Sequence, residues 1–442
     1  MEQQKNSASL VLPVGLMLFS FFFGAGNLIF PPVLGQAAGD NLWSAVWGFC
    51  VSGVGMPLLG VLAIVINNYV NSYEMALPVQ STYAKVVMIL CALTIGPFFA
   101  APRTAAVSYE TGIQFFLAPS MHDLGMLIYS VLFFALTYYL CVNPSDLVDN
   151  IGKILTPLLL LSLALLIVFA VVKPMGNAGA AVEAYRSAPY FKGLLEGYNT
   201  MDLLAAMLFG PATIQAIKLK GITDQKVLGK VCIYAGLVAA ACLAVVYASL
   251  AYIGATSVNQ LGLETNGGKL LNMISTYYFG EFGLVVLTLI IFFACITTSV
   301  GLCTSISSYF EILADGKITY RQFVIGMCLF SLCVSNIGLS NIIKFSIPVL
   351  CMLYPVIVVL VLLNCGNRIF NRDKMIYRCC MIPTTIFAVF DGLRAAGIDT
   401  GVVNAFLSKT VPLYDIGFGW IVPAVIGIAV GYILRVVFKS GK

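Results

Sequence analysis

Small and polar residues interrupt an apolar stretch near the N-terminus. They lie within the run from Phe19 to Pro32 and are Gly24, Ala25, Gly26 and Asn27. Backbone N–H and C=O groups that are released at membrane depth are costly unless a partner satisfies them. The two glycines let a ligand approach the main chain, Asn27 adds an amide oxygen, and the Pro31-Pro32 pair is expected to end the outer half-helix. The stretch therefore predicts half of a binding site for a polar solute and a companion ion, with close helix packing as the alternative.

A second interruption is expected where Phe209-Gly210-Pro211 divides a later apolar stretch. A proline inside a helix removes one hydrogen bond and clashes with the preceding turn. The Phe-Gly pair also occurs at Phe23-Gly24, and many secondary transporters consist of two inverted halves whose first helices are both broken. The pattern predicts a functional break, with a plain proline kink as the alternative.

Charged residues also occur within or at the start of apolar stretches, and Arg103, Glu110 and Asp202 are the three considered for gating. Charges inside membrane segments are rare and usually face a cavity or a partner. Arg103 and Glu110 are expected to form an outer gate, unless they are a snorkelling pair at the interface. Asp202 is a third candidate for gating, or it caps its helix, because the helix dipole favours a carboxylate in the first turn.

The composition is that of an integral membrane protein, since 60% of the 442 residues are hydrophobic and 10% are charged. The net charge of +5 is dispersed over short loops without a basic tract, which argues against nucleic-acid binding. The 13 cysteines show no CxxC spacing and are interpreted as free, apolar fillers. His122 is the only histidine, and no HExxH, GxSxG or paired-carboxylate motif occurs, which argues against a membrane enzyme.

About twelve apolar segments have the length that a bilayer requires, so we expect one all-α membrane domain over residues 1–442. After the N-terminal run they are Trp43–Ile66, Tyr83–Leu117, Gly125–Val142, Ile151–Val172, Thr200–Ile217, Val231–Ile253, Phe282–Tyr309, Gln322–Val334, Ile342–Leu363, Met375–Ala395 and Phe418–Val437. About two thirds of the 24 Lys and Arg residues fall in alternate connections that include both termini, which predicts cytoplasmic termini. The outer connections 173–199, 254–281 and 397–415 are expected to hold short helices that act as gates.

Four segments resemble the branched-chain amino acid:cation symporters, the BrnQ-type carriers of bacteria. They are Leu16–Gly39 (LMLFSFFFGAGNLIFPPVLGQAAG), Gly53–Gly60 (GVGMPLLG), Gly96–Tyr109 (GPFFAAPRTAAVSY) and Tyr198–Gly210 (YNTMDLLAAMLFG). The resemblance runs through nearly the whole chain. It implies sodium-coupled uptake of leucine, isoleucine and valine, and a distant similarity to LeuT-fold transporters. In that fold two inverted halves of five helices, with helices 1 and 6 broken, correspond here to about 9–172 and 198–363, and two extra helices to about 375–437.

The first helix of LeuT-fold sodium symporters carries a Gly-x-Gly-Asn stretch, whose amides bind the substrate carboxylate and whose Asn side chain binds sodium. The residues that match it are Gly24, Gly26 and Asn27. The resemblance thus implies that the carboxylate meets the amides of Gly24–Asn27, and we expect the ammonium group at carbonyls around Phe209-Gly210. The branched side chain is expected in an apolar pocket formed by Phe22, Phe23 and Phe209.

A second sodium site of that fold lies between the eighth helix, at an Ala-x-x-Thr-Ser/Thr pattern, and carbonyls of the first helix. Ala294, Thr297 and Thr298 resemble the pattern, and the carbonyls are those near Ser20 and Phe23. Sodium prefers such hard neutral oxygens. The alternative is that these hydroxyls bond back to their own turn, as is common in membrane helices.

The sequence therefore predicts a sodium-coupled amino-acid symporter of the cell membrane that works by alternating access, without an organic cofactor or an obligate protein partner. A proton-coupled carrier of the same fold is the main alternative. A channel is disfavoured, because two dissimilar broken helices in one chain suit alternating access better than a pore built from repeated rings.

Overall fold

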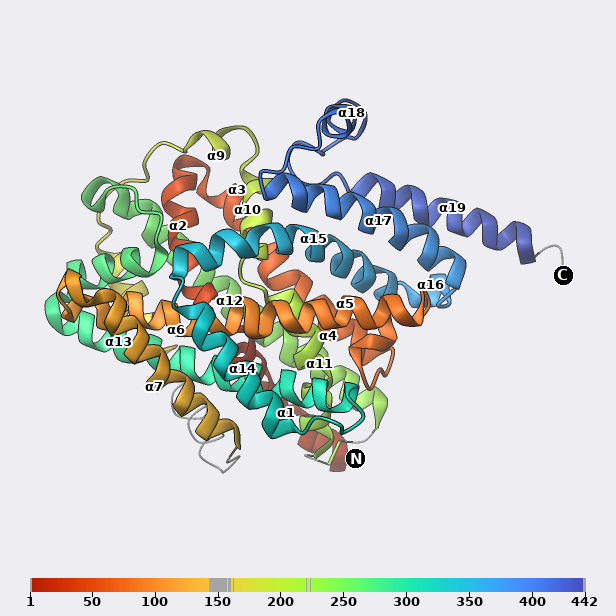
Figure 1. Ribbon diagram of the computed structural model, residues 1–442, viewed down its shortest axis with the longest axis horizontal. Coiled ribbons are helices and arrows are strands. Elements are labelled where there is room, and N and C mark those ends of the chain that lie inside the picture. The colour runs from red at the N-terminus through yellow and green to blue at the C-terminus, as the bar shows by residue number, and fades with distance from the viewer. Residues whose placement is uncertain are drawn as a thin grey trace.

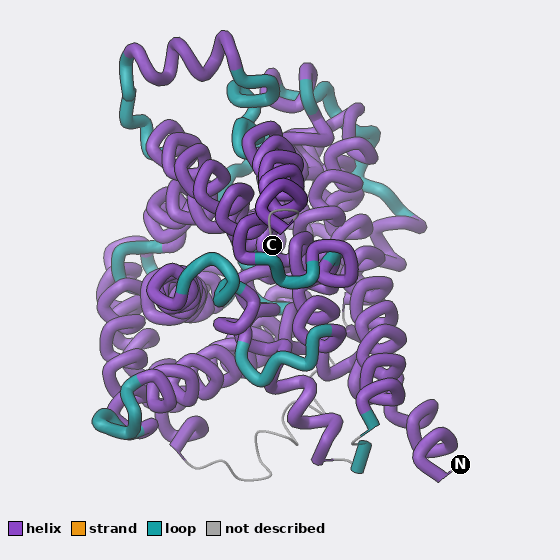
Figure 2. The backbone as a smooth tube through the Cα atoms, turned by 90° about the vertical axis from the view of Figure 1, so that its right-hand side faces the viewer, coloured by secondary structure: helices purple, strands orange, loops and turns teal. Residues whose placement is uncertain are grey.

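The computed structural model describes residues 2–142, 163–219 and 224–439, together with a few positions between them. All regular structure in this part of the chain is helical (Figures 1 and 2). Helices satisfy every backbone hydrogen bond within one segment, which a bilayer demands of any lipid-exposed chain. The predicted segment 151–172 lies largely outside the described residues, and its described part includes the helix Leu163–Val172.

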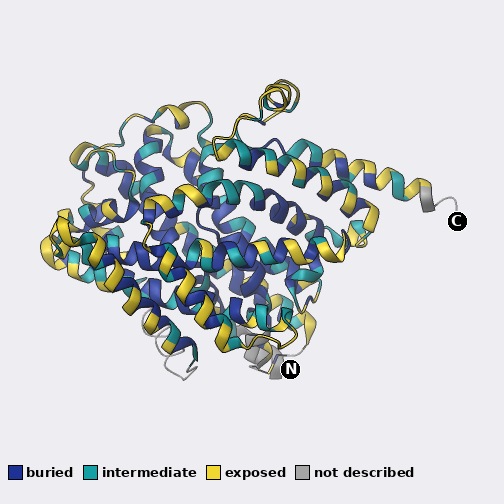
Figure 3. Cartoon of the chain, viewed as in Figure 1, coloured by how far each residue is buried: buried dark blue, intermediate teal, exposed yellow. Residues whose placement is uncertain are grey.

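Within the part of the chain that the structure describes, seven helical segments are long and apolar enough to cross a membrane. They are Ala25–Ile66, Ser81–Phe116, Pro119–Val142, Gln225–Leu261, Gly267–Leu313, Leu339–Cys365 and Lys374–Ala395. Shorter apolar helices are Ser9–Phe22, Leu163–Val172, Asp202–Ile214, Tyr320–Ser335 and Ile421–Val437. Large apolar side chains such as Trp47, Leu132 and Phe282 are exposed, as expected where lipid takes the place of water. Figure 3 shows that exposed residues recur along the outer helices. The prediction of an all-α membrane protein is confirmed.

The N-terminal half contains seven helices of the described chain before residue 143. They are α1 (Glu2–Phe22), α2 (Ala25–Ala38), α3 (Leu42–Cys50), α4 (Met56–Ile66), α5 (Ser81–Leu93), α6 (Ala100–Thr111) and α7 (His122–Val142). A π-helical turn, Val51–Gly55, joins α3 to α4, and a second, Thr94–Phe98, precedes α6. Gly96 leaves helical geometry in the second turn, with ψ of −120°, so the third predicted segment bends near its middle.

Apart from the helix Leu163–Val172, the remaining described helices follow residue 182. They are α9 (Glu183–Ser187), α10 (Pro189–Tyr198), α11 (Asp202–Leu219), α12 (Gln225–Leu261), α13 (Gly267–Leu313), α14 (Tyr320–Ser335), α15 (Leu339–Cys365), α16 (Asn367–Phe370), α17 (Lys374–Ala395), α18 (Val402–Thr410) and α19 (Ile421–Lys439). Short helices occur in two of the predicted outer connections, as α9 with α10 and as α18. The connection 254–281 is instead mostly the ends of α12 and α13, and α13 bends at Gly280, where φ is 62°.

The first break lies at Phe23-Gly24, between α1 and α2, within the stretch that the sequence singles out. Ala25, Gly26 and Asn27 form the first turn of α2. The expectation that Pro31-Pro32 ends the outer half-helix is wrong, because α2 continues through both prolines to Ala38. Prolines are tolerated in membrane helices where neighbouring groups satisfy the released carbonyls.

The predicted break at Phe209-Gly210-Pro211 is also wrong, because α11 runs without interruption from Asp202 to Leu219. The chain leaves helical geometry earlier, at 199–201 between α10 and α11, where Met201 has φ of 63°. A single proline removes only one ladder hydrogen bond, and surrounding helices can hold the helix together. The sixth predicted segment is thus broken, but at its beginning and not at its middle.

Glycines allow α2 to pack directly against α12. This contact holds α2, the helix that follows the first break, in place. A Cβ atom added to Gly35 of α2 would overlap the carbonyl group of Ala251 in α12. A Cβ atom on Gly254 of α12 would likewise overlap the carbonyl group of Pro32 in α2. Close backbone approach of this kind drives helix association in lipid, where burial of apolar surface contributes little.

Gly35→Ala is expected to lower the free energy of unfolding by about 1–3 kcal/mol, because the new methyl group must displace the α12 backbone. Thermal unfolding of the detergent-solubilised protein measures the change. Gly229→Ala is the matched control, since Gly229 also lies in a helix and a Cβ atom there meets nothing within 4 Å. The gain in helix propensity is then the same in both variants. Equal melting temperatures would contradict the direct α2–α12 contact.

Candidate functional site

Two helix ends face each other at the first break. Gly24 has extended backbone (φ −121°, ψ −166°) and precedes the first turn of α2. The Phe23 N–H donates back to the Phe19 carbonyl at 2.7 Å, whereas the Gly24 N–H donates forward to Asn27 Oδ1 at 3.0 Å. The last carbonyls of α1 and the first N–H groups of α2 have no partner within their own helices. The negative end of one helix dipole therefore meets the positive end of the next.

Asn27 joins the first break to the second. Its Nδ2 atom donates to Asp202 Oδ2 at 2.7 Å and also to the Tyr247 hydroxyl. The Tyr247 hydroxyl in turn donates to Asp202 Oδ2 at 3.1 Å. All three side chains are buried, and they come from α2, α11 and α12. A buried polar network that is satisfied in this way fixes the geometry of the helices that supply it.

Arg103 of α6 reaches the second break from the opposite side. Its Nη1 atom donates to the Asn199 carbonyl at 2.8 Å, and its guanidinium lies 5.3 Å from the centroid of the Phe30 ring. The side chain is 2% exposed, and its charge attracts that of Asp202. A buried carbonyl in a non-helical stretch requires such a donor. Arg103 therefore holds the chain where α10 ends.

A pocket with about 400 Å³ of empty space lies between the two breaks. Its polar lining comprises Gly24, Ala25, Gly26, Asn27, Arg103, Thr104, Thr200, Asp202 and Thr298. Its apolar lining comprises Phe21, Phe22, Ile95, Ala100, Met201, Ala205, Phe209 and Leu302. Positions i, i+3 and i+7 share one helix face, so Asp202, Ala205 and Phe209 follow one another along α11 from the polar to the apolar part. The pocket thus has a polar part and an apolar part, both of which include residues of α11.

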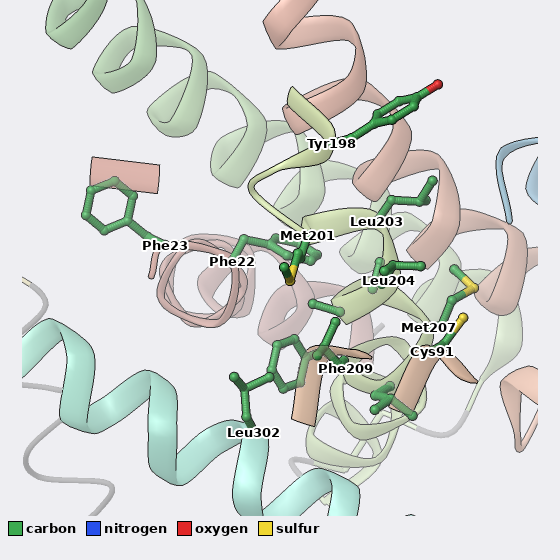
Figure 4. Packing of buried hydrophobic residues seen from close by; sticks show 14 of the residues in the cluster. Phe22, Phe23, Cys91, Tyr198, Met201, Leu203, Leu204, Met207, Phe209 and Leu302 are labelled. Atoms are coloured by element: carbon green, nitrogen blue, oxygen red, sulfur yellow. The ribbon is translucent and has the colours of Figure 1, made fainter. Parts of the chain in front are cut away.

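The predicted substrate residues divide into two groups. Gly24, Ala25, Gly26, Asn27 and Phe209 line the pocket, as does Phe22. Phe23 does not, because its ring stacks on Phe19 with centroids 4.9 Å apart, and Figure 4 shows it away from Met201 and Phe209. Gly210 does not line it either, since a Cβ atom there would lie 2.6 Å from Ile64 of α4. The peptide groups at Phe209-Gly210 lie inside α11, so they are not free to receive an ammonium group.

The predicted sodium residues on α13 make local hydrogen bonds. The Thr297 hydroxyl donates to the carbonyls of Phe293 and Ala294, and the Thr298 hydroxyl donates to the Ala294 carbonyl at 2.9 Å. Of these residues only Thr298 lines the pocket. A methyl group on Gly24 would lie 3.3 Å from Thr298 Oγ1, so this hydroxyl is adjacent to the first break. The role of these oxygens toward a cation stays a prediction.

The predicted outer gate of Arg103 and Glu110 is not formed. Glu110 Oε2 accepts from Asn266 Nδ2, and Glu110 Oε1 accepts from the Leu339 N–H, each at 2.8 Å. Glu110 therefore caps the N-terminus of α15 and holds the residue that precedes α13, where a carboxylate is favoured by the helix dipole. Glu110 lies seven residues after Arg103, so the two side chains share one helix face. They do not pair with each other, because Arg103 donates to Asn199 and Glu110 accepts from Asn266 and Leu339. Asp202 is at the start of α11, where the capping alternative placed it.

Several residues of the site were not predicted, and three of them matter most for the argument, namely Tyr247, Asn199 and Ala205. Tyrosine is ordinary in a membrane helix, so nothing in the sequence around Tyr247 marks its hydroxyl as a partner of Asn27. Asn199 carried a usable signal, because the polar run Asn199-Thr200 sits just before an apolar stretch and beside Asp202. Ala205 is one of many alanines and carries no signal.

Comparison with known proteins places the chain among transport proteins. A profile described as "Branched-chain amino acid transport protein" matches residues 7–438. The branched-chain amino acid permease BraB of Bacillus subtilis (strain 168) is 44% identical over 429 residues, which are 97% of this chain and 96% of the relative. The branched-chain amino acid transport system 2 carrier protein of Pseudomonas aeruginosa is 39% identical over 426 residues, 96% and 95% of the two chains. The branched-chain amino acid permease BrnQ of Escherichia coli (strain K12) is 34% identical over 426 residues, with the same coverage of 96% and 95%.

The fold is similar to that of Mhp1, a nucleobase-cation-symport-1 family transporter. Its closed conformation with bound bromovinylhydantoin superimposes with a TM-score of 0.63 at 12% identity, over 97% of this chain and 93% of Mhp1. The inward-facing conformation gives a TM-score of 0.56 at 11% identity, over 97% and 90%. The chain therefore has a fold similar to that of the LeuT-fold transporter Mhp1, and this similarity says nothing about the ligand.

Proposed function

The chain belongs to the family of branched-chain amino acid transport proteins, and on that premise we propose that it imports leucine, isoleucine and valine in symport with sodium. It is a multi-pass permease and not an enzyme. The observation that carries the proposal is the pocket between the two helix breaks, which has a polar part and an apolar part. A free branched-chain amino acid is likewise charged at one end and apolar at the other.

We propose twelve membrane spans in the cell membrane, with both termini in the cytoplasm. The two repeats would cover about 9–172 and 198–363, followed by the extra helices at about 375–437. The breaks support this arrangement, because they fall in the first helix of each half, as inverted-repeat transporters require. The outward side would then carry α9, α10 and α18.

We propose that the substrate lies with its charged groups toward the start of α2. The N–H groups of Ala25, Gly26 and Asn27 would receive the carboxylate at the positive end of the helix dipole, together with the Arg103 guanidinium. The ammonium group would face the Asp202 carboxylate in place of the carbonyls at Phe209-Gly210. The branched side chain would lie along Ala205 toward the apolar lining.

The proposed sodium site consists of the Thr298 hydroxyl and carbonyls near Ser20 and Phe23, at the end of α1. These are hard, neutral oxygens, and Thr298 is adjacent to Gly24. One charge moved across about 100 mV contributes about 2.3 kcal/mol, and a roughly tenfold sodium gradient adds about 1.4 kcal/mol. Movement of one sodium ion down its electrochemical gradient would therefore supply enough free energy for strong accumulation of substrate.

Proton coupling is the second candidate, and Asp202 is the observation that favours it. A buried carboxylate inside a membrane helix is a common proton carrier in transporters. Uptake of radiolabelled leucine into proteoliposomes separates the candidates. Sodium symport requires uptake that is driven by an inward sodium gradient and lost when potassium replaces sodium. Equal uptake in potassium under an inward proton gradient would select the second candidate.

Thr298→Ala is expected to raise the sodium concentration that gives half-maximal leucine uptake by about tenfold, the effect of losing one cation ligand worth about 1.4 kcal/mol. Thr304→Ala is the matched control, because Thr304 makes the same bonds to preceding carbonyls of α13 but lies outside the pocket. Sodium titration of initial uptake rates measures both variants. An equal sodium dependence in the two variants would contradict the proposed site.

A further inference from the structure

Figure 1 shows α9, α10 and α18 on one side of the protein. A second cavity lies beside α10. It has about 1090 Å³ of empty space between α10, α15, α17 and the connection that follows α18, and it shares no lining residue with the pocket between the breaks. We call it the α10 cavity. Its polar lining includes Lys192, Glu196, Tyr198, Asn199, Asp391 and Arg394.

Asp391 of α17 brings a buried, incompletely paired carboxylate to this cavity. The residue is 3% exposed, and its Oδ1 atom lies 3.4 Å from Arg394 Nη2. Its Oδ2 atom has no hydrogen-bond partner among the residues that the structure describes. A buried acceptor without a donor is costly, and a charged acceptor more so. This oxygen is therefore suited to a donor from outside the chain.

Tyr198 supplies a second buried polar atom without a partner within the described chain. Its ring is stacked on Tyr354, with centroids 4.2 Å apart, which fixes the side chain. Figure 4 shows the Tyr198 hydroxyl pointing away from the cluster around Met201 and Phe209. Tyr198 of α10 and Asp391 of α17 both line this cavity, and each has a buried polar atom without a partner among the described residues.

The rest of the lining carries both charges and apolar side chains. Lys192 and Glu196 of α10 form an ion pair at 2.9 Å, and Arg394 lies over the Tyr414 ring at 4.6 Å. Glu196, Asp391 and Asp415 are acidic whereas Lys192 and Arg394 are basic, so the lining has one more negative than positive charge. The apolar lining includes Phe191, Leu195, Ile347 and Leu350.

We propose that the α10 cavity is a second binding site for a zwitterionic amino acid with an aliphatic side chain. The ammonium group meets Asp391 Oδ2, the carboxylate meets Lys192 or Arg394, and the side chain lies against Leu195. A bare cation fits poorly, because Asp391 Oδ2 and the Tyr198 hydroxyl are two oxygens where a hard cation takes about six. The inference rests on the proposed transport function and extends it to the outward side.

Asn199 connects this cavity to the pocket between the breaks. Its Nδ2 atom donates to Glu196 Oε2 at 2.9 Å in the cavity wall, and its carbonyl accepts from Arg103 Nη1 at 2.8 Å on the pocket side. A ligand that competes for Glu196 or Lys192 therefore acts on the residue that Arg103 holds. The occupancy of the α10 cavity is therefore coupled to that of the pocket between the breaks.

Equilibrium binding of radiolabelled leucine to the purified full chain, in detergent with sodium, tests the second site. We expect two leucines per wild-type chain, one per Asp391→Asn chain and one per Asp202→Asn chain. Lys192→Gln changes a half-exposed ion pair and leaves the fold intact, and it should weaken one of the two binding events by about tenfold.

The outcomes separate this inference from the proposed function. Suppose that the wild-type chain binds one leucine, that Asp202→Asn abolishes this binding, and that Asp391→Asn and Lys192→Gln leave it unchanged. This result overturns only the second site. A wild-type chain that binds no leucine overturns the proposed function as well. A third outcome is that every variant and the wild type bind one leucine per chain, while Asp391→Asn abolishes the binding of radioactive sodium. This outcome would identify a cation site and overturn the amino-acid assignment.

Discussion

Asp202→Asn should reduce sodium-driven leucine uptake by about 100-fold or more, because every loss of about 1.4 kcal/mol is a factor of about ten and a buried charge partner is worth about 2–5 kcal/mol. The carboxylate accepts from Asn27 and Tyr247 and is proposed to face the substrate ammonium group. The amide of asparagine has the same shape but no charge. Initial uptake rates in proteoliposomes, normalised to the amount of reconstituted protein, measure the loss.

Asp315→Asn is the control, since Asp315 is exposed after the end of α13 and should transport like wild type. Leucine counterflow, which needs no ion gradient, distinguishes two reasons for the loss. A substrate-binding role removes counterflow together with accumulation. A pure proton-coupling role would remove accumulation and leave counterflow intact. Wild-type uptake by Asp202→Asn would refute both roles.

The class of the protein and the first break could be predicted from the sequence, because both depend on local composition. Apolar segments of bilayer length are read directly, and Gly24 followed by Asn27 marks a place where an amide can replace a helical hydrogen bond. The structure shows this replacement, in which the Gly24 N–H donates to Asn27 Oδ1. The prolines at 31 and 32 misled the prediction of the helix end, because lipid-embedded neighbours compensate for the bonds that proline removes.

The second break could not be placed from the same reasoning. Pro211 is a strong local signal, yet α11 includes it, whereas the actual break at 199–201 depends on long-range partners. Arg103, far away in sequence, supplies the donor that stabilises the Asn199 carbonyl. Whether a polar run unwinds in a membrane is thus decided by residues that a local pattern does not contain.

The charged residues show the same limit. Arg103 and Glu110 share a helix face, which suggested a pair, but Asn199 and Leu339 present partners that single-sequence spacing cannot reveal. Intramembrane charges were correctly expected to have partners. Which partner each charge has is a property of the assembled helices.

Ala205→Val is expected to lower the preference for leucine over valine by about tenfold or more. Ala205 lines the pocket between Asp202 and Phe209 on one face of α11, so its side chain borders the space proposed for the branched group. In apolar pockets one methylene separates ligands by about 1–3 kcal/mol, and added methyl groups in the wall penalise the longer ligand more. A general folding defect lowers both rates and leaves their ratio unchanged.

The central claim is that a branched-chain amino acid occupies the pocket between the two helix breaks. The ratio of leucine to valine uptake, measured by mutual competition in proteoliposomes, tests it in Ala205→Val beside Ala212→Val, a change on the same helix outside the pocket lining. We predict that the ratio falls about tenfold in Ala205→Val and stays at the wild-type value in Ala212→Val. An unchanged ratio in Ala205→Val, with uptake still measurable, would show that the substrate binds elsewhere.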